Sequence, residues 1–508
     1  MKGREHRFSQ GWLGTLITLS LLGGSLLGAS GGVPTAGAQD WVEPHPAFQA
    51  AAAYGAAAPS LQSASPSAPE GLTSNQTLYL PIIAHQYTPV QSVFGVQMDA
   101  INNSRGLQEA IAARVAMVRS AMFRWSEIEP VRTNPPTYHW EVVDEAGLVN
   151  AAQNRMTLIA GVLSTPPWAQ KIPGYYCGPV RQDSLDEFAQ FLQAMVNRYS
   201  GSPYYVRYWE LWNEPDVDPF AFSPPMDPNS GYGCWGDSSD PSGFGGGYYA
   251  TMLKTALPAI KAADPKAKVL IGGLLLDCDP NNPPPGKDCH ASNFLQGILA
   301  NGGGPYFDIV SYHAYTYFWG LGSFYNPNWP GSDTAIPVKT AFLRSVLAEY
   351  GFADKPLINT EAAVLCSTDS SDCRETQAMY VPRAYAEAMA LDLKGQLYYR
   401  MINEAWRFTG LLWPGLWPKP AYYAYGTASD FLAGLEYEHP VQGYPAKIDG
   451  YAFSRVNRAP YTDVIWSSDG SAVAVSLPPG ATAYDRYGDV IGSGTITVNY
   501  SPVYVVKP

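Results

Sequence analysis

Two glutamates in this 508-residue chain stand where a pair of carboxyl groups could perform acid–base and nucleophilic chemistry. Glu214 ends the strand-like segment YWELWNE at positions 208–214, and Glu361 ends the segment PLINTE at positions 356–361. A carboxyl group that directly follows a buried strand is unfavourable unless it is paired or used. One carboxylic acid can protonate a leaving oxygen while a second carboxylate attacks the adjoining carbon, and this chemistry breaks a glycosidic bond. The two glutamates are therefore the candidate catalytic pair.

The neighbours of Glu214 extend this interpretation. Asn213 could donate a hydrogen bond to a substrate hydroxyl beside the reacting carbon. Glu210 alternates with Trp212, so we expect Glu210 to be a buried, hydrogen-bonded strand residue. A negative Glu361 is expected to raise the pKa of Glu214 and so keep the acid protonated. Carboxyl groups about 5–5.5 Å apart would retain the anomeric configuration, whereas a gap of about 6.5–9.5 Å would invert it.

An alternation of strand-like and helix-like segments must position these residues. The predicted strands are residues 93–98, 117–123, 157–163, 206–212, 269–275, 307–312, 356–360 and 396–402. The predicted helices are residues 106–117, 141–154, 184–199, 247–263, 292–300, 338–350, 376–391 and 421–432. Eight such units predict an α/β fold, with the strands closed into a (β/α)8 barrel. Strands four and seven lie across a barrel, so Glu214 and Glu361 would face each other at one mouth.

A doubly wound open sheet is the competing α/β fold. It would need a glycine-rich turn after its first strand, and the segment QMDAI at positions 97–101 contains no glycine. After about residue 435 the helical periodicity ends, and short strands separated by Asp-Gly, Pro-Gly and Tyr-Gly turns predict a small all-β sandwich. This sandwich could brace the barrel or bind glycan, and the absence of an evident aromatic row favours bracing.

The N-terminal segment has the pattern of a secretory signal. Three basic residues precede an apolar run at 12–29, and the small-residue sequence AGA at 36–38 is a cleavage site. An uncleaved membrane anchor is the alternative, because an 18-residue apolar run approaches the length that spans a bilayer. The predicted domains are a signal peptide (1–38), an Ala/Pro/Ser linker (39–75), a catalytic barrel with its N-terminal lead-in (76–433) and a sandwich (434–508). We therefore expect a secreted protein, or one tethered to the cell surface.

Export makes disulfides the expected state of the six cysteines. Six cysteines can pair in many ways, but Cys278 with Cys289 and Cys366 with Cys373 are close in sequence. We favour these two pairs together with Cys177–Cys234. The sequence contains no C-x-x-C or H-E-x-x-H motif, so it does not support a zinc site. We expect no metal and no cofactor.

The composition narrows the class of ligand. The formal net charge of −12 argues against nucleic acid, because phosphate binding needs a basic surface. Charged residues make up only 15% of the chain and aromatic residues 13%, which suits uncharged, ring-shaped ligands that stack on aromatic faces. A glycan or oligosaccharide is the expected partner, and no oligomeric state is assigned. Trp168, Trp235, Trp319 and Trp329 are candidates to line the cleft.

The segment Trp212-Asn213-Glu214-Pro215 resembles the Asn-Glu-Pro signature of the large clan of retaining glycoside hydrolases with (β/α)8 barrels. The resemblance spans roughly residues 94–428. It implies that Glu214 is the acid/base and Glu361 the nucleophile. A barrel followed by a sandwich is most similar to glycoside hydrolase family 39, which includes β-xylosidases, and family 5-like enzymes are the near alternative. The loops at 219–247 and 277–289 depart from the family pattern.

The resemblance also implies roles for residues outside the carboxylate pair. Residues 311–315, SYHAY, are similar to the clan's His-x-Tyr, so Tyr315 would hydrogen-bond the nucleophile and His313 would line the substrate site. Trp406 would form the floor of the sugar subsite. Arg124 would support the nucleophile, with Arg119 as its competitor if the second strand ends earlier. These residues together predict hydrolysis of β-linked glycosides or polysaccharides with retention.

Two other functions fit the same residues. A non-catalytic carbohydrate-binding or adhesion protein could use a decayed barrel, although such a site would usually have lost one of these groups. A transglycosylase would share the chemistry and differ in the acceptor.

Overall fold

The computed structural model describes residues 92–403, 406–455 and 460–508. The predicted signal peptide (1–38), the linker (39–75) and the predicted strand at 78–83 lie outside the described residues. In the part of the chain that is described, no helix is both long and apolar enough to cross a membrane.

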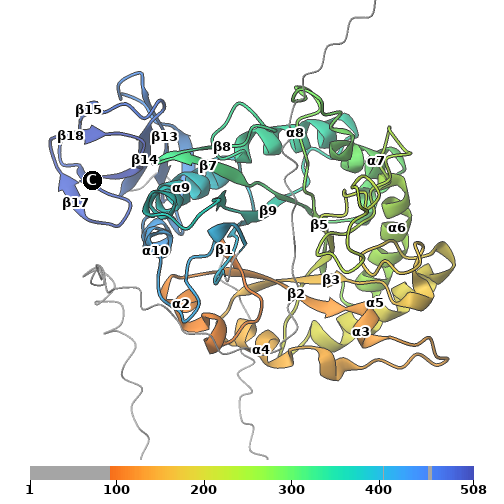
Figure 1. The fold of residues 1–508 in the computed structure, drawn as a ribbon. Helices are drawn as coiled ribbons and strands as arrows, with labels where there is room; N and C mark the ends of the chain where they lie inside the picture. The colour runs from red at the N-terminus through yellow and green to blue at the C-terminus, as the bar shows by residue number, and fades with distance from the viewer. Residues whose placement is uncertain (1–91, 404–405, 456–459) are drawn as a thin grey trace, which may run out of the picture. The chain divides into compact units, whose positions relative to one another are not determined.

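Eight parallel strands form the centre of the fold, and Figure 1 shows helices around them. The strands are β1 (Phe94–Gln97), β2 (Met117–Arg124), β3 (Thr157–Leu163), β4 (Tyr208–Asn213), β5 (Lys268–Gly273), β6 (Val310–His313), β9 (Leu357–Ala362) and β11 (Gln396–Tyr398). Their order is β5-β4-β3-β2-β1-β11-β9-β6. Parallel bridges between Leu270 and Ile309 and between Leu274 and Tyr312 join the two ends, so the sheet closes. The predicted (β/α)8 barrel is confirmed.

Helices follow the strands. They are α2 (Leu107–Ala112), α3 (Trp125–Ile128), α4 (Glu145–Gln153), α5 (Leu185–Tyr199), α6 (Gly246–Ala263), α7 (Phe294–Ala300), α8 (Ile336–Glu349), α9 (Ser371–Ala390) and α10 (Pro420–Leu432). Two of them, α4 and α9, begin at a side-chain cap. In α5 the buried residues Leu185, Phe188 and Leu192 recur at helical spacing, which turns one face to the barrel. The Ser370 side chain accepts the Cys373 N–H and starts α9 five residues before the predicted start at 376.

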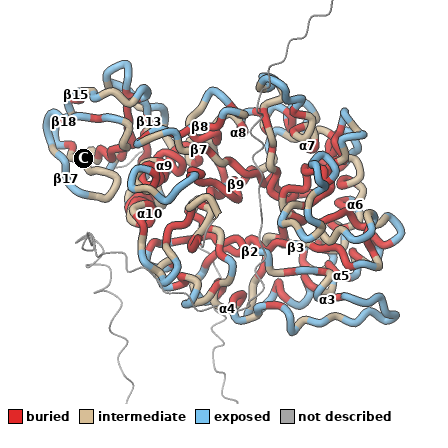
Figure 2. The backbone as a smooth tube through the Cα atoms, in the orientation of Figure 1, coloured by how far each residue is buried: buried red, intermediate tan, exposed pale blue. Residues whose placement is uncertain are grey.

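The interior of the barrel changes from apolar to polar along the strands. Met117, Ile159, Leu270, Ile309, Ile358 and Leu397 form an apolar cluster of their own. Inward-facing residues recur every second position in a strand, so Arg119 and Ser311 follow Met117 and Ile309 into the next layer toward the carboxyl ends. Figure 2 shows that β2, β3 and β9 are buried along much of their length. Charged groups in this layer therefore lie in a water-poor interior.

A small hairpin interrupts the barrel pattern. Strands β7 (Thr316–Gly320) and β8 (Ser323–Tyr325) pair antiparallel directly after β6, and β7 also pairs with β10 (Val364–Leu365), which follows β9. The sequence analysis left these residues without an element. The last predicted barrel strand, at 396–402, is shorter than expected and ends at Tyr398.

The C-terminal region is all-β, as predicted. A six-stranded sheet has the order β12-β13-β14-β19-β16-β17, and β15 pairs with β18. These strands are β12 (Glu436–Pro440), β13 (Ile448–Ser454), β14 (Tyr461–Ser467), β15 (Val473–Ser476), β16 (Thr482–Tyr484), β17 (Val490–Gly492), β18 (Thr495–Val498) and β19 (Val503–Lys507). Helix α10 ends at Leu432 and β12 begins at Glu436.

All three predicted disulfides are present, and they join Cys177 to Cys234, Cys278 to Cys289 and Cys366 to Cys373. Cys177–Cys234 links the loop after β3 to the loop after β4. The disulfide therefore ties together two loops that follow neighbouring strands.

Candidate active site

The end of β4 presents Glu214 through an unusual backbone path. Trp212 and Glu214 both have left-handed φ angles, of 66° and 47°, which residues other than glycine seldom adopt. Asn213 pairs with Gly273 of β5, and the Glu214 N–H donates to the Gly273 carbonyl at 2.9 Å. Strained conformations of this kind persist where the surrounding structure holds them, and they cluster at functional sites.

Glu214 and Glu361 meet at the carboxyl ends of β4 and β9. His313 Nδ1, at the end of β6, lies 2.7 Å from Glu214 Oε1 and 3.5 Å from Glu361 Oε2. One oxygen of each carboxyl group and a nitrogen of this ring all lie within 4.8 Å of one another. The register between β6 and β9 shifts next to His313 and Glu361, and such a bulge re-aims a side chain. The structure thus brings together three of the predicted site residues.

Arg119 and Tyr315 hold the carboxylate of Glu361. Arg119 Nη1 donates to Glu361 Oε1 at 2.5 Å, and the Tyr315 hydroxyl donates to Glu361 Oε2 at 2.5 Å. Arg119 also donates to Glu210 at 2.5 Å and to Asn213 Oδ1 at 2.6 Å. The expectation that Arg124 supports the nucleophile position is wrong: Arg124 is half exposed and lies 3.7 Å from Glu127. Arg119 lies two residues after Met117 and points into the barrel, where it reaches Glu361. Arg124 is the last residue of β2 and is exposed.

Glu210 is a structural residue, as predicted. It is fully buried, and its two oxygens accept hydrogen bonds from Arg119 and from the Ser311 hydroxyl. Burial opposes the charged form of Arg119, but Glu210 and Glu361 outweigh it and raise the pKa of Arg119. Arg119 therefore stays cationic, and its charge is shared between two buried carboxylates.

Glu214 has the proton affinity of a general acid. Burial, which disfavours the charged carboxylate, is the main cause that raises its pKa to about 7, and Glu210 adds to it. The positive charges of Arg119 and Lys339 act in the opposite direction. The sequence analysis attributed this rise to Glu361, and that attribution is wrong because burial dominates and the added negative charge is that of Glu210.

His313 is a neutral, fixed ring. Burial lowers the pKa of His313 to about 4, so the ring is uncharged near neutral pH. Its Nδ1 atom is hydrogen-bonded to Glu214 in this neutral form. Lys339 Nζ donates to the His313 carbonyl at 2.8 Å and to the Leu275 carbonyl at 2.7 Å. The ring lies against Gly273, where an added Cβ would come within 2.2 Å of Nε2. Only a residue without a side chain fits there.

Three aromatic rings form a cluster that reaches Glu361 through Tyr315. Tyr315 lies edge-on to Trp406 at 5.5 Å and to Tyr399 at 5.8 Å, and Trp406 lies 5.3 Å from Tyr399. Trp406 follows β11 by a loop and begins a short 3-10 helix, Trp406–Phe408. The structure thus places Trp406 beside Tyr315, the residue whose hydroxyl donates to Glu361.

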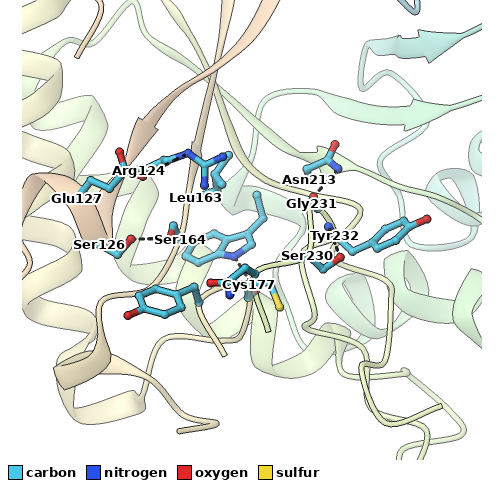
Figure 3. Close-up of a pocket in the computed structure, with 13 residues that line it drawn as sticks. Arg124, Ser126, Glu127, Leu163, Ser164, Cys177, Asn213, Ser230, Gly231 and Tyr232 are labelled. Atoms are coloured by element: carbon cyan, nitrogen blue, oxygen red, sulfur yellow. Dashed lines mark hydrogen bonds and ion pairs between the residues drawn. The ribbon is translucent and has the colours of Figure 1, made fainter. Parts of the chain in front are cut away.

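A polar pocket of about 290 Å³ lies beside Asn213, at the end of β4 (Figure 3). Arg124 and Glu127 lie on one side of it, and Asn213, Gly231 and Tyr232 lie on the other. Asn213 Nδ2 donates to the Gly231 carbonyl at 2.9 Å, while its Oδ1 atom accepts from Arg119. Asn213 therefore belongs both to the pocket wall and to the network around Glu361. Arg124 is a pocket residue, and its predicted contact with Glu361 is not made.

Glu214, His313 and Glu361 are also the one group of described residues that offers three ligand atoms to a metal ion. The guanidinium of Arg119 lies 2.5 Å from Glu361 and occupies one of its oxygens with a positive charge. Tyr315 occupies the other oxygen. A dication bound there would lie close to the positive charge of Arg119, which already contacts Glu361.

Lys339, Asp216 and Gly273 also belong to the site and were not predicted from the sequence. Asp216 accepts the Leu275 and Leu276 N–H groups, and burial raises its pKa to about 7. Burial likewise lowers the pKa of Lys339 to about 8, and Asp216 and Glu214 oppose this effect. Lys339 is the second residue of the helix predicted at 338–350, and a lysine in a first turn carries no sign of burial. Asp216 could have been identified from the sequence, because it is an acidic residue two positions after Glu214.

Comparisons with known proteins were made for the whole chain. No protein-family model matches the sequence, and no curated protein sequence matches it. Solved structures do match. A family 39 glycoside hydrolase from the gut symbiont Bacteroides cellulosilyticus WH2 is 19% identical, with a TM-score of 0.63 over 83% of this chain and 81% of that one.

Two further structures share the fold. A GH30 endoxylanase from Clostridium papyrosolvens C71 is 13% identical, with a TM-score of 0.52 over 83% of this chain and 97% of that chain. A GH51 α-L-arabinofuranosidase from Thermotoga petrophila RKU-1 is 11% identical, with a TM-score of 0.52 over 82% of this chain and 97% of that chain. The chain therefore has the (β/α)8-barrel fold of these glycoside hydrolases of families 39, 30 and 51, and family 39 is the one that the sequence resemblance predicted.

Proposed function

We propose that this protein is a retaining glycoside hydrolase, with Glu214 as general acid/base and Glu361 as nucleophile. The observation that carries the proposal is the geometry of the two carboxyl groups, which have oxygens within 4.8 Å of each other and of one His313 nitrogen. A retaining site needs a gap of about 5–5.5 Å, whereas an inverting site needs room for a water at about 6.5–9.5 Å.

The first step forms a covalent intermediate. Glu361, oriented by hydrogen bonds from Arg119 and Tyr315, attacks the anomeric carbon as a carboxylate. The bond from this carbon to the leaving oxygen breaks, and Glu214 donates its proton to that oxygen. A pKa of about 7 keeps Glu214 protonated in weakly acidic solution before the step.

The second step regenerates the enzyme. Esterification removes the negative charge of Glu361, and Glu214 is now a carboxylate beside Arg119 and Lys339. It takes a proton from a water that attacks the anomeric carbon from the face the leaving group vacated. The ester bond to Glu361 breaks, and two displacements leave the configuration retained.

The substrate class and the location follow from the same reasoning. The proposed substrates are glycosides or polysaccharides of uncharged sugars, because the rings of Tyr315, Tyr399 and Trp406 can stack on flat sugar faces. The proposal that the linkage is β rests on the resemblance of residues 212–215 to the Asn-Glu-Pro signature. Three disulfides suit a protein that works in an oxidising, extracellular compartment, so we propose that it is secreted.

The test uses paired α- and β-aryl glycosides with the wild type, Glu214→Ala and Glu361→Gly. Each variant should lose at least about 10³-fold in kcat, and exposed Glu436→Ala is the matched control. Sodium azide should restore turnover of an activated aryl glycoside by Glu361→Gly and give a glycosyl azide of inverted configuration. With Glu214→Ala, azide should give the retained configuration instead, because Glu361 still forms the ester.

The outcomes also separate the alternative functions. Full activity of Glu361→Gly would contradict the two-carboxylate mechanism. Tight glycan binding by wild type without any hydrolysis would favour a binding protein. A product in which an added sugar replaces water would show a transglycosylase that uses the same residues.

A further inference from the structure

The β7–β8 hairpin extends outward from the nucleophile position. Tyr315, which donates its hydroxyl to Glu361, directly precedes β7, and its carbonyl accepts a hydrogen bond from Asn326 Nδ2 at 2.9 Å, just after β8. An extended chain advances about 3.3 Å per residue, so Trp319 can lie roughly 13 Å further out than Tyr315. The hairpin is thus anchored at the reaction centre and reaches well beyond one sugar ring.

The two faces of the hairpin differ. On one face, Phe324 is buried and lies 5.5 Å from Tyr380 of α9 and 5.8 Å from Tyr500. Successive side chains alternate between the faces of a strand, and Tyr317 pairs with Tyr325 across the hairpin. Tyr317, Trp319 and Tyr325 therefore share the other face, which we call the aromatic platform.

The aromatic platform faces solvent. The Trp319 side chain is 60% exposed and stacks on Tyr325 at 4.8 Å with an angle of 29° between the rings. Of the four tryptophans considered for the cleft, Trp235 and Trp329 are buried in the core and Trp168 packs on Trp125. Exposure of a large stacked aromatic pair is unfavourable in water, so its position calls for a ligand with flat apolar faces.

The aromatic platform and the polar pocket lie on opposite sides of the catalytic pair. The pocket residues Arg124, Ser164 and Asn213 follow or end β2, β3 and β4, whereas the hairpin follows β6 and pairs with the chain after β9. In the closed order of eight strands, β2 and β3 are opposite β6 and β9. A chain that touches both must cross the mouth over Glu214 and Glu361.

We propose that the substrate is an extended, uncharged glycan that crosses the barrel mouth, with one sugar stacked on the aromatic platform and another in the polar pocket. This inference rests on the proposed hydrolase function and adds that cleavage is internal to the chain. In the polar pocket, the charges of Arg124 and Glu127 are paired with each other. This pair therefore offers no net charge that would bind a charged sugar. Stacking on Trp319 and Tyr325 selects sugars whose ring hydrogens form a flat face.

The experiment compares wild type with Trp319→Ala on two kinds of substrate: an aryl monoglycoside, and oligosaccharides of increasing length with the same linkage. For wild type, kcat/KM should rise with chain length. Trp319→Ala should keep the wild-type kcat/KM on the aryl glycoside but lose about 3- to 10-fold on the longer substrates, the effect of one lost aromatic contact. Leu321→Ala is the matched control, because it removes an equally exposed apolar side chain from the same hairpin.

Several results would overturn the inference. Trp319→Ala could lose activity equally on both substrates, Leu321→Ala could reproduce its effect, or wild-type kcat/KM could be independent of length. Products released singly from a chain end would also contradict internal cleavage. If wild type cleaves no glycoside, the proposed function fails separately. Affinity electrophoresis in soluble polysaccharides then decides: retardation that Trp319→Ala abolishes supports the platform, and no retardation in any polysaccharide overturns it.

Discussion

Burial acts in opposite directions on the acidic and basic groups at the barrel mouth. It raises the pKa of Glu214 to about 7 and lowers that of His313 to about 4, because each loses the water that would solvate its charge. Burial, with Glu361 as the next cause, also raises the pKa of Tyr315, which remains a hydroxyl donor. Around pH 6 the residues therefore supply a protonated acid, a neutral ring and a hydroxyl that donates to Glu361.

This distribution predicts the pH dependence of activity. Glu214 must hold a proton for the first step, so kcat/KM should decline as pH rises through about 7. Lys339 is a positive charge that lowers the pKa of Glu214, so Lys339→Met should move this alkaline limb to higher pH. The measurement is kcat/KM on an aryl glycoside from pH 4 to 10.

Lys355→Met is the matched control for this shift. Lys355 is a half-buried lysine that donates to the Phe307 carbonyl and is not among the charges that act on Glu214. Its pH profile should match that of wild type. An alkaline limb that stays in place in Lys339→Met would remove Lys339 from the control of Glu214, and a profile flat to pH 10 would contradict Glu214 as the acid.

At the scale of elements, the contact between β4, β5 and β6 sets the position of the acid. The Glu214 N–H donates to Gly273 of β5, and His313 of β6 reaches Glu214 across the same glycine. A Cβ at position 273 would come within 2.2 Å of His313 Nε2 and 2.8 Å of Thr360 Oγ1. Three strands can therefore bring the two side chains together only because one position between them has no side chain.

Gly273→Ala should displace the His313 ring and break its hydrogen bond with Glu214. We expect kcat to fall about 10- to 100-fold, since small misplacements of catalytic groups have effects of this size. Overpacking should lower the free energy of unfolding by about 1–3 kcal/mol. Gly201→Ala is the control, because a Cβ there meets no atom within 4 Å. Unchanged kcat in Gly273→Ala would show that the ring position is not critical.

At the scale of the whole molecule, side-chain contacts join the C-terminal region to the barrel. Arg486 Nη2 and the Tyr487 hydroxyl both donate to Glu375 of α9, and the Tyr500 hydroxyl donates to Asp333 at 2.7 Å. Arg383 of α9 lies 4.8 Å from the centre of the Trp466 ring. These contacts support the interpretation that the sandwich braces the barrel.

Arg486→Ala should therefore weaken the whole fold without altering the chemistry. Its side chain is 16% exposed and carries charge-assisted hydrogen bonds, so we expect the free energy of unfolding to fall by about 1–3 kcal/mol. Activity at 25 °C should remain within twofold of wild type, because no Arg486 contact reaches Glu214 or Glu361. Urea denaturation of both variants is the measurement.

The control for Arg486→Ala is Lys447→Ala. Lys447 pairs with Asp469 in the same region, but both side chains are about half exposed, and such pairs contribute little to stability. Equal unfolding midpoints for the two variants would contradict a bracing role for Arg486.

The strands of the barrel could be predicted because their apolar residues are local patterns. The predicted strand at 157–163 matches β3, Thr157–Leu163, since each side chain there is set by its own alternation and burial. The predicted eighth strand, 396–402, was too long, because the apolar residues after Tyr398 belong to a loop. The β7–β8 hairpin was missed, since its short strands have no pattern that separates them from a loop.

The sequence by itself determined the order of the barrel strands and helices, the all-β C-terminal region and the candidacy of Glu214 and Glu361, because these depend on local motifs, spacing and periodicity along the chain. It favoured one pairing of the cysteines among several, and the structure contains that pairing. Only the tertiary structure decided that Arg119 and not Arg124 contacts Glu361, and that burial and Glu210 raise the pKa of Glu214. It alone brought Gly273 against His313 and set Trp319 on an exposed face. These outcomes depend on which side chains the closed barrel turns toward one another and on how much water it excludes.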